Sequence, residues 1–255
     1  MSRYTYGDSE TAAERLELVA RLFEPTSRSF LAASVGTPAP NLALDLGCGP
    51  GHTTALVHAV SGAARTVGLD RSSAFAHGAR VTAPLGVAFV AADVAAPALP
   101  TGPAGLIYAR LLLAHLADPR ALVRRWSTQL TIGGRILIDD LETIDTREGV
   151  FRAYLDDVAL TVVRAQGGVL FVGPVLHTAR DPSGLARVHD EVATFTPPAA
   201  ETARVFGMNL AVLTERGEIR PRPEMADALG AIAGGAQAAA PVGWSVRQLA
   251  WRRTG

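Results

Sequence analysis

The sequence LALDLGCGPGHTT, residues 42–54, indicates the fold of the chain. Its apolar start predicts a short buried strand that ends at Asp45. Three glycines follow at a spacing of two, namely Gly47, Gly49 and Gly51. Residues 54–60 are good helix formers, so the turn leads into a helix. A strand, a glycine-rich turn and a helix are together typical of the first part of a nucleotide-binding βαβ unit.

Length and composition narrow the possible classes of protein. The chain has 255 residues, of which 48% are apolar, and this is enough for one sizeable core. No apolar run reaches the length of about 18 residues that a membrane span needs, and the polar N-terminus does not resemble a signal peptide. With 24 basic and 24 acidic residues, the balanced charge offers no electrostatic attraction for nucleic acid or an anionic membrane.

Residue usage excludes several kinds of chemistry. Every basic residue is arginine, which excludes a P-loop lysine and a Schiff-base lysine. Cys48 is the only cysteine, so no internal disulfide forms, and a reducing cytoplasm fits this usage. The six histidines show no metal-ligand spacing, and we expect no metal site.

Apolar strands alternate with amphipathic helices along the chain. The predicted strands are 42–45, 65–70, 87–93, 106–110, 135–139, 187–196 and 244–251. The predicted helices are 9–24, 52–61, 72–80, 118–130, 149–166, one near 173, 199–214 and 224–233, with Pro25 ending the first. This alternation predicts an α/β fold: a Rossmann-like, doubly wound, mostly parallel seven-stranded sheet with helices on both faces and an added helical cap.

We expect a single domain with four parts. They are an N-terminal helical lid (1–40), a cofactor-binding core (41–148), a helical substrate-side insertion (149–185) and C-terminal strands and helices (186–255).

Three carboxylates follow three neighbouring strands of the predicted sheet. Asp45, Asp70 and Asp93 lie where these strands end, which is the edge at which open α/β sheets bind ligands. The glycines depart from the G-x-G-x-x-G pattern of dinucleotide binding, because the third one comes a position early. A carboxylate at the end of the second strand suits the paired hydroxyls of a ribose.

Five motifs in order carry a resemblance to a known family. They are LALDLGCGPG at 42–51, VGLD at 67–70, AADV at 91–94, LIYARLLLAHL at 106–116 and IGGRILIDD at 132–140. The chain resembles the class I S-adenosylmethionine-dependent methyltransferases, and its flanks resemble a small-molecule, biosynthetic branch. The resemblance implies S-adenosyl-L-methionine as the cofactor, with S-adenosyl-L-homocysteine as the product.

The resemblance also implies roles for individual residues. Asp45 is expected near the methionine amino group, Asp70 at the ribose hydroxyls and Asp93 at the adenine amino group. The implied cofactor-binding residues are Tyr6, Asp45, Gly47, Gly49, Gly51, Asp70, Arg71, Ser72, Asp93, Val94, Arg110 and His115.

The cofactor's sulfonium makes a good leaving group, so the enzyme has mainly to align the two reactants. Holding them in line lowers the barrier to methyl transfer. A general base helps only an acceptor that carries a proton, and the candidates are Asp140 and His115. The candidate substrate contacts are Tyr6, Glu142, Tyr154 and His177.

We expect methyl transfer to a small, apolar, natural-product-like acceptor. The alternative is an S-adenosylmethionine-binding enzyme of the same fold that catalyses a cyclisation, elimination or rearrangement. The residues do not distinguish an oxygen, nitrogen or carbon acceptor, and they do not indicate an oligomeric state.

Overall fold

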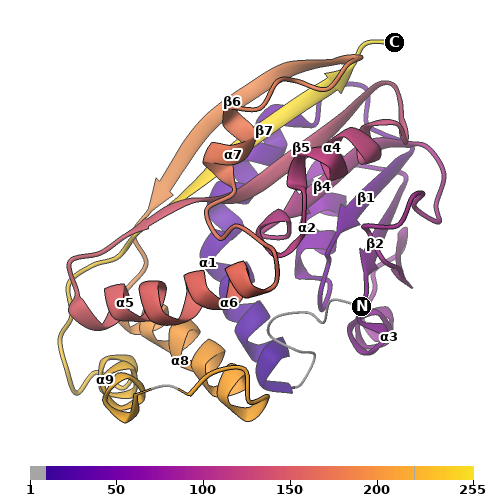
Figure 1. The fold of residues 1–255 in the computed structure, drawn as a ribbon. Coiled ribbons are helices and arrows are strands. Elements are labelled where there is room, and N and C mark those ends of the chain that lie inside the picture. The colour runs from indigo at the N-terminus through magenta and orange to yellow at the C-terminus, as the bar shows by residue number, and fades with distance from the viewer. Residues whose placement is uncertain (1–9, 221) are drawn as a thin grey trace.

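The computed structural model describes residues 10–220 and 222–255 (Figure 1). Within this part of the chain, seven strands form one sheet in the order β3-β2-β1-β4-β5-β7-β6. The strands are β1 (Leu42–Leu46), β2 (Arg65–Asp70), β3 (Val87–Ala91), β4 (Ala104–Arg110), β5 (Leu130–Asp145), β6 (Leu185–Phe195) and β7 (Gly243–Arg253). Only β7 runs antiparallel to its two neighbours. The predicted mostly parallel, doubly wound sheet is therefore confirmed.

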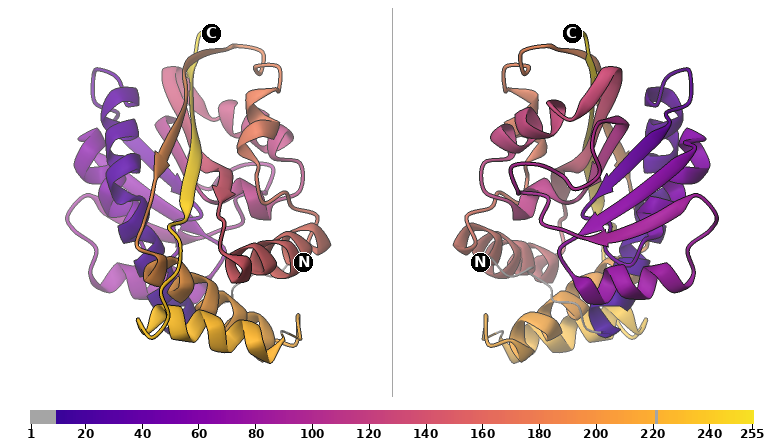
Figure 2. Two further views of the ribbon diagram at one scale, coloured as in Figure 1. Left: turned by 90° about the vertical axis from the view of Figure 1, so that its left-hand side faces the viewer. Right: turned by 90° about the vertical axis from the view of Figure 1, so that its right-hand side faces the viewer.

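Helices cover both faces of the sheet (Figure 2). On one face lie α1 (Glu10–Ser34), α2 (His52–Ser61) and α3 (Ser73–Val81), and on the other lie α4 (Pro119–Ser127) and α7 (Gly173–His177). Phe30 of α1 and Val57 of α2 share a core cluster with Tyr108 of β4. Trp126 of α4 and Leu176 of α7 belong to the cluster on the opposite face. Burial of these apolar side chains on both faces explains why the strands are almost uniformly apolar.

A helical cap lies at one end of the sheet (Figures 1 and 2). Its elements are the first half of α1, α5 (Gly149–Tyr154), the π-helical turn η2 (Leu155–Ala159), α6 (Leu160–Ala165), α8 (Ala199–Glu215) and α9 (Pro223–Ala233). Phe23, Tyr154 and Phe206 pack in one buried cluster with Trp244 of β7, so the cap shares its core with the end of the sheet.

The prediction that Pro25 ends the first helix was wrong, because α1 continues to Ser34. A proline inside a helix removes one backbone hydrogen bond. The turns beyond Pro25 bury Ser27, Phe30 and Leu31, and this burial outweighs the lost bond.

Two further elements differ from the predictions. The single helix expected over 149–166 is divided by η2, whose wider turn interrupts the α-helical ladder. Strand β5 extends past the predicted end at Asp139 because it pairs with β7 as far as Asp145. Asp140 therefore lies inside a strand.

No helix in residues 10–220 and 222–255 is long and apolar enough to cross a membrane. Among the same residues, no group of three histidine, cysteine or acidic side chains is placed to hold a metal ion.

Candidate active site

A cavity of about 1200 Å³ lies between the glycine-rich turn and the cap. Its sheet side is formed by the turn after β1, the ends of β2 and β4, and the 3-10 turn η1 (Leu113–His115). Its cap side is formed by α1, α5, η2 and α8. The volume and the two-sided lining are suited to a nucleotide-sized ligand next to a second small molecule.

The glycine-rich turn is closed against β2 by backbone hydrogen bonds. The amides of Gly47 and Cys48 donate to the carbonyl of Leu69 at 2.8 and 3.1 Å. The amide of Gly49 donates to Oδ2 of Asp70 at 2.8 Å. Gly47 and Gly49 both line the cavity and have φ angles of 70° and 51°, which glycine adopts without strain.

Gly51 differs from the other two glycines. It is not part of the cavity wall, and it precedes α2 with a φ of 98°. A Cβ atom here would lie 2.7 Å from Cζ of Phe89. The structure therefore gives Gly51 a packing role in place of the predicted close approach to the cofactor.

Backbone amides hold both carboxylate oxygens of Asp70 at the end of β2. Its Oδ1 accepts from the amide of Ser72 at 2.8 Å, while Oδ2 accepts from Gly49. Burial raises its pKa, and the amide hydrogen bonds act in the opposite direction. Each carboxylate oxygen has a second lone pair, so Asp70 has acceptors left for two hydroxyl groups.

Asp45 lies beneath the turn and outside the cavity wall, with a relative exposure of 1%. The hydroxyl of Thr54 donates to its Oδ2 at 2.7 Å, and burial raises its pKa to about 7. The predicted contact with the methionine amino group is therefore not what this geometry provides. Asp45 instead ties α2 to β1 under the glycine-rich turn.

The other predicted cofactor residues fall into two groups. The structure brings most of them to the same cavity wall: Arg71, Ser72, Asp93, Val94, Arg110 and His115. Tyr6 lies outside the described residues. Asp93 is exposed, and its Oδ1 accepts from the amide of Ala95 at 2.9 Å.

Asp140 and His115 meet at the turn η1. The amide of Leu113 donates to Oδ2 of Asp140 at 2.9 Å, and the amide of Leu141 donates to Oδ1 at 2.9 Å. Burial raises the pKa of Asp140 to about 7. Burial, and after it the positive charge of Arg15, lowers the pKa of His115 to about 4, so its imidazole is neutral at physiological pH. Both side chains line the cavity, and Asp140 holds the backbone of η1. Their role as a general base stays a prediction.

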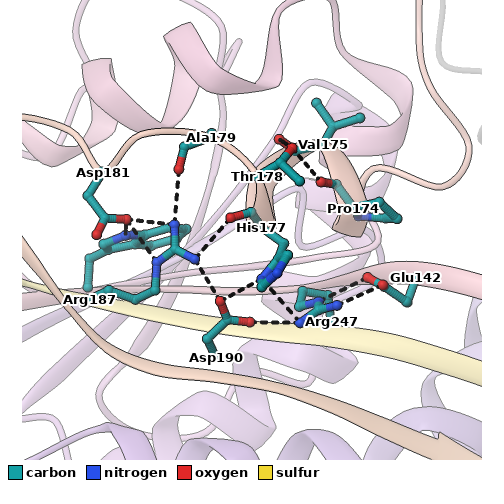
Figure 3. Close-up of polar contacts among 11 residues, drawn as sticks. Glu142, Pro174, Val175, His177, Thr178, Ala179, Asp181, Arg187, Asp190 and Arg247 are labelled. Carbon is teal, nitrogen blue, oxygen red and sulfur yellow. Dashed lines mark hydrogen bonds and ion pairs between the residues drawn. The ribbon is translucent and has the colours of Figure 1, made fainter.

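Glu142 and His177 are not part of the cavity wall. Both belong to a network of polar contacts with Arg247 and Asp190 (Figure 3). Two nitrogens of Arg247 donate to the two carboxylate oxygens of Glu142 at 2.7 and 3.0 Å. Asp190 accepts from Arg247 at 2.9 Å and lies 2.8 Å from Nδ1 of His177. The prediction that both residues contact substrate is not supported, because this ion-pair network on β5, β6, β7 and α7 holds them.

Tyr154 lies in the cavity wall, and its contact with substrate stays a prediction. It is joined there to two residues that sequence reasoning missed. The side-chain amide of Asn209 donates to the Tyr154 hydroxyl at 2.8 Å, and Arg15 donates through Nε to the Asn209 oxygen. One sequence signal was available for Arg15. It lies in register with Ala12, Leu18 and other apolar residues on the buried face of α1, where an unpaired charge is costly.

The doubly wound sheet and the glycine-rich turn at the cavity define an α/β protein that binds a nucleotide-like ligand. Comparisons with known proteins place it in the same class. Residues 44–138 match a family described as a methyltransferase domain. These residues form a class I S-adenosylmethionine-dependent methyltransferase domain, as the motifs of the chain predict.

One curated relative shows how far the sequence similarity extends. A trans-aconitate 2-methyltransferase from Methylobacterium radiotolerans is 43% identical over 108 residues, which make up 42% of this chain and 41% of the relative. The match therefore spans about two-fifths of the relative's length.

Solved structures share the fold at low sequence identity. A protein from Bacillus halodurans that is classed as a methyltransferase has a TM-score of 0.60 at 14% identity, covering 90% of this chain and 100% of its own. The N-methyltransferase NodS from Bradyrhizobium japonicum, in complex with S-adenosyl-L-homocysteine, has a TM-score of 0.50 at 13% identity. That alignment covers 91% of this chain and 88% of NodS.

Proposed function

We propose that the protein transfers the methyl group of S-adenosyl-L-methionine to a small-molecule acceptor bound under the cap. This proposal rests mainly on the observation that a single cavity extends from the glycine-rich turn to the cap. Its sheet side contains the family's cofactor motifs, and its cap side adds a separate wall from α1, α5, η2 and α8.

The residues on the sheet side suit the cofactor. Asp70 is the acceptor for the ribose hydroxyls, because the amides of Gly49 and Ser72 each bond one of its oxygens and fix the orientation of the carboxylate. Gly47 and Gly49 let the ligand approach the backbone closely. Arg110, at the end of β4, supplies a positive charge for the carboxylate of the methionine part. The cofactor, when bound, supplies an electrophilic methyl group on a positively charged sulfur.

The contribution of the protein to the reaction is alignment and the exclusion of water. The cap encloses the acceptor opposite the cofactor-binding turn, and holding two reactants in line supplies up to about 7–11 kcal/mol in the best cases. Much of the cap wall is apolar, including Val19, Phe23, Leu155, Phe206 and Trp244. These side chains suit a small, natural-product-like acceptor with an apolar body, and they support a role in secondary metabolism.

The name of the curated relative makes trans-aconitate a second acceptor to test. The similarity to that relative covers 42% of this chain, so it leaves more than half of the chain, and with it much of the cap, unmatched. A cytoplasmic location accords with the buried, free Cys48.

A labelling experiment tests the function directly. Purified protein is incubated with methyl-labelled S-adenosyl-L-methionine and a panel of small acceptors that includes trans-aconitate. We expect equal amounts of released S-adenosyl-L-homocysteine and labelled product. Asp70→Ala is expected to abolish the transfer, while Glu142→Gln, outside the cavity, retains it. Conversion of an acceptor without label would overturn the proposal and favour a non-methylating reaction on the same fold.

A further inference from the structure

The loop that follows β3 forms one end of the cavity wall. Its residues Asp93, Val94 and Ala95 line the cavity. Because the strand order is β3-β2-β1, this loop lies beyond Asp70 as seen from the glycine-rich turn after β1. A nucleoside that has its ribose at Asp70 and the rest of the molecule at the glycine-rich turn therefore extends its base toward this loop.

Two hydrogen bonds inside the loop fix the position of Asp93. The amide of Ala95 donates to its Oδ1 at 2.9 Å, and the amide of Ala96 donates to its carbonyl at 3.0 Å. An ionised carboxylate accepts hydrogen bonds and donates none, so it suits an amino group on a base and disfavours a keto oxygen. The place of this carboxylate depends on where the peptide groups that follow it are held.

Side chains of α4 hold these peptide groups from outside the cavity. Trp126 is fully buried, and its indole Nε1 donates to the carbonyl of Val94 at 2.8 Å. Nη1 of Arg125 donates to the carbonyl of Ala95. Neither α4 residue is part of the cavity wall. The loop is therefore fastened on the side that faces away from the ligand.

The indole N–H is needed because the Val94 carbonyl lies in a dry place. Val94 has a relative exposure of 6% and belongs to the same apolar cluster as Trp126. A buried carbonyl without a donor is unfavourable, so without the indole N–H the peptide group of Val94 would turn toward water. Asp93 and Ala95 are its neighbours in the chain, and the turn that joins them would shift with it.

We infer that Trp126 and Arg125 are positioning residues for the adenine of the cofactor, because they hold the loop that carries Asp93. This inference rests on the proposed binding of S-adenosyl-L-methionine. Asp93 accepts from the amino group of the base, and α4 keeps its carboxylate in place. The preference for adenine is thus set partly by a helix that does not line the cavity.

Two ligands that differ only in the base test the inference without turnover. The probes are S-adenosyl-L-homocysteine and S-inosyl-L-homocysteine, in which a keto oxygen replaces the amino group, each titrated by calorimetry. We expect the wild-type protein to bind the adenine ligand about tenfold or more tightly, because the keto oxygen cannot donate to Asp93. Trp126→Phe keeps a buried ring and removes the N–H donor, so this preference should fall about three- to tenfold.

The chain offers a matched control for each substitution. Trp251 belongs to the same cluster as Trp126, and its Nε1 donates to Asp181 at 2.7 Å, away from the cavity wall. Trp251→Phe loses a comparable hydrogen bond and should keep the full preference. Arg125→Met leaves the buried cluster unchanged and should lower the preference about twofold or more. Its control, Arg124→Met, removes an exposed arginine of the same helix and should keep the preference.

The ratio of the two affinities separates positioning from a general loss of structure, because both ligands share the ribose and the amino acid. The inference is overturned if the wild-type protein binds both ligands equally well, or if either folded variant, Trp126→Phe or Arg125→Met, keeps the full preference. An equal loss of affinity for both ligands, or a loss of preference in Trp251→Phe as large as in Trp126→Phe, overturns it as well. If circular dichroism shows that Trp126→Phe does not fold, the Arg125 and Arg124 pair decides. Failure of the wild-type protein to bind S-adenosyl-L-homocysteine would instead overturn the proposed function.

Discussion

On the sheet side of the cavity, the hydrogen bond that orients Asp70 joins it to Gly49, 21 residues earlier in the chain. On the cap side, Arg15 is oriented by Asn209, 194 residues away, and Asn209 by Tyr154, 55 residues away. The first arrangement follows from one strand–turn–helix unit and the neighbouring strand. The second exists only after three helices from different parts of the chain have packed together.

This difference explains why the two sides differ in how far they resemble other proteins. A local unit has a recognisable spacing of residues, and the matched family covers residues 44–138, which form the sheet side. The cap side has no comparable motif, since its contacts join single residues across long separations. We therefore expect changes on the sheet side to affect the cofactor, and changes on the cap side to affect the acceptor alone.

The largest effect is expected for Asp70→Ala. The substitution removes the acceptor of the Gly49 and Ser72 amides together with the acceptor proposed for the ribose. Hydrogen bonds to a charged group contribute about 1.5–3 kcal/mol each, and two are lost here, so affinity for S-adenosyl-L-homocysteine should fall about 100-fold or more. Calorimetric titration measures this, with Tyr154→Phe on the cap side as the control. Unchanged affinity in Asp70→Ala would show that the cofactor is bound elsewhere.

A second prediction separates the glycines of the turn. In Gly51→Ala, the new Cβ would meet Phe89 at 2.7 Å at a φ of 98°, so we expect a loss of about 1–3 kcal/mol in the free energy of unfolding. Urea denaturation measures it. The control is Gly78→Ala in α3, where no atom lies within 4 Å of the new Cβ. This control should stabilise the fold by about 0.5–1 kcal/mol, because glycine inside a helix is unfavourable. Equal stabilities of the two variants would contradict the packing role of Gly51.

A third prediction concerns Asp140, which connects the two sides through η1. An amide at this position cannot accept from both Leu113 and Leu141, so Asp140→Asn should lose about 1–3 kcal/mol of stability at pH 5. The pKa of the wild-type carboxyl is raised from 3.8 to about 7 by burial. The protonated carboxyl therefore gives its full contribution to the free energy of unfolding below pH 3.8, and this contribution is lost as the pH rises through 7.

The stability difference between wild type and Asp140→Asn should accordingly shrink between pH 5 and pH 8. Urea denaturation of both proteins at several pH values measures this, and other titrating groups cancel in the difference. A gap that stays constant over this range would mean that Asp140 is ionised in the native protein throughout it, and would contradict the raised pKa.

A smaller effect is expected for Tyr154→Phe. It removes the hydroxyl that accepts from Asn209, so Arg15 is held less firmly while the ring stack on Phe206 remains. One neutral hydrogen bond contributes about 0.5–1.5 kcal/mol, which predicts a rise of about three- to tenfold in the KM for the acceptor. Affinity for S-adenosyl-L-homocysteine should not change. A loss of cofactor affinity of similar size would contradict the expectation that the cap side affects only the acceptor.

The smallest effect on the cavity is expected for Glu142→Gln. This substitution breaks one bidentate ion pair of Arg247 in the network on β5, β6 and β7. The loss in stability should be about 1 kcal/mol, because the pair is partly solvated, and it should diminish at high salt. Titrations of cofactor and acceptor are expected to match the wild type. Weakened acceptor binding would restore the first expectation that Glu142 contacts substrate.

The sequence was most informative where structure is local. The strand ends that carry Asp70 and Arg110 were predicted because apolar runs and turn residues determine them over a few positions. Asp93 was expected at the end of its strand as well, but β3 ends at Ala91 and Asp93 lies in the loop that follows. The family resemblance then assigned these residues to a cofactor. The place of Asp140 inside a longer β5 could not be predicted, because its pairing partner β7 comes about 100 residues later in the chain.

Tertiary contacts explain the remaining errors. Pro25 is a helix breaker by local rules, yet the burial of Phe30 and Leu31 keeps α1 intact. Glu142 and His177 lie in the strand and helix expected near the acceptor, but Arg247 and Asp190 hold them on another face. Arg15 and Asn209 are ordinary polar residues of amphipathic helices until packing brings them to the cavity.

Pro25 also has a mechanical consequence for α1. The first half of the helix lines the cavity, while the second half is fastened to the sheet by the Ser27 hydroxyl on Asp139 at 2.6 Å and by Arg135 on the Ser34 carbonyl at 2.7 Å. Since proline has no amide hydrogen, bending the helix at this point breaks one backbone hydrogen bond fewer than bending it elsewhere. The helix therefore has a natural hinge between its anchored and its lining half. A bend at this point would move the half that lines the cavity while the half fastened to the sheet stays in place.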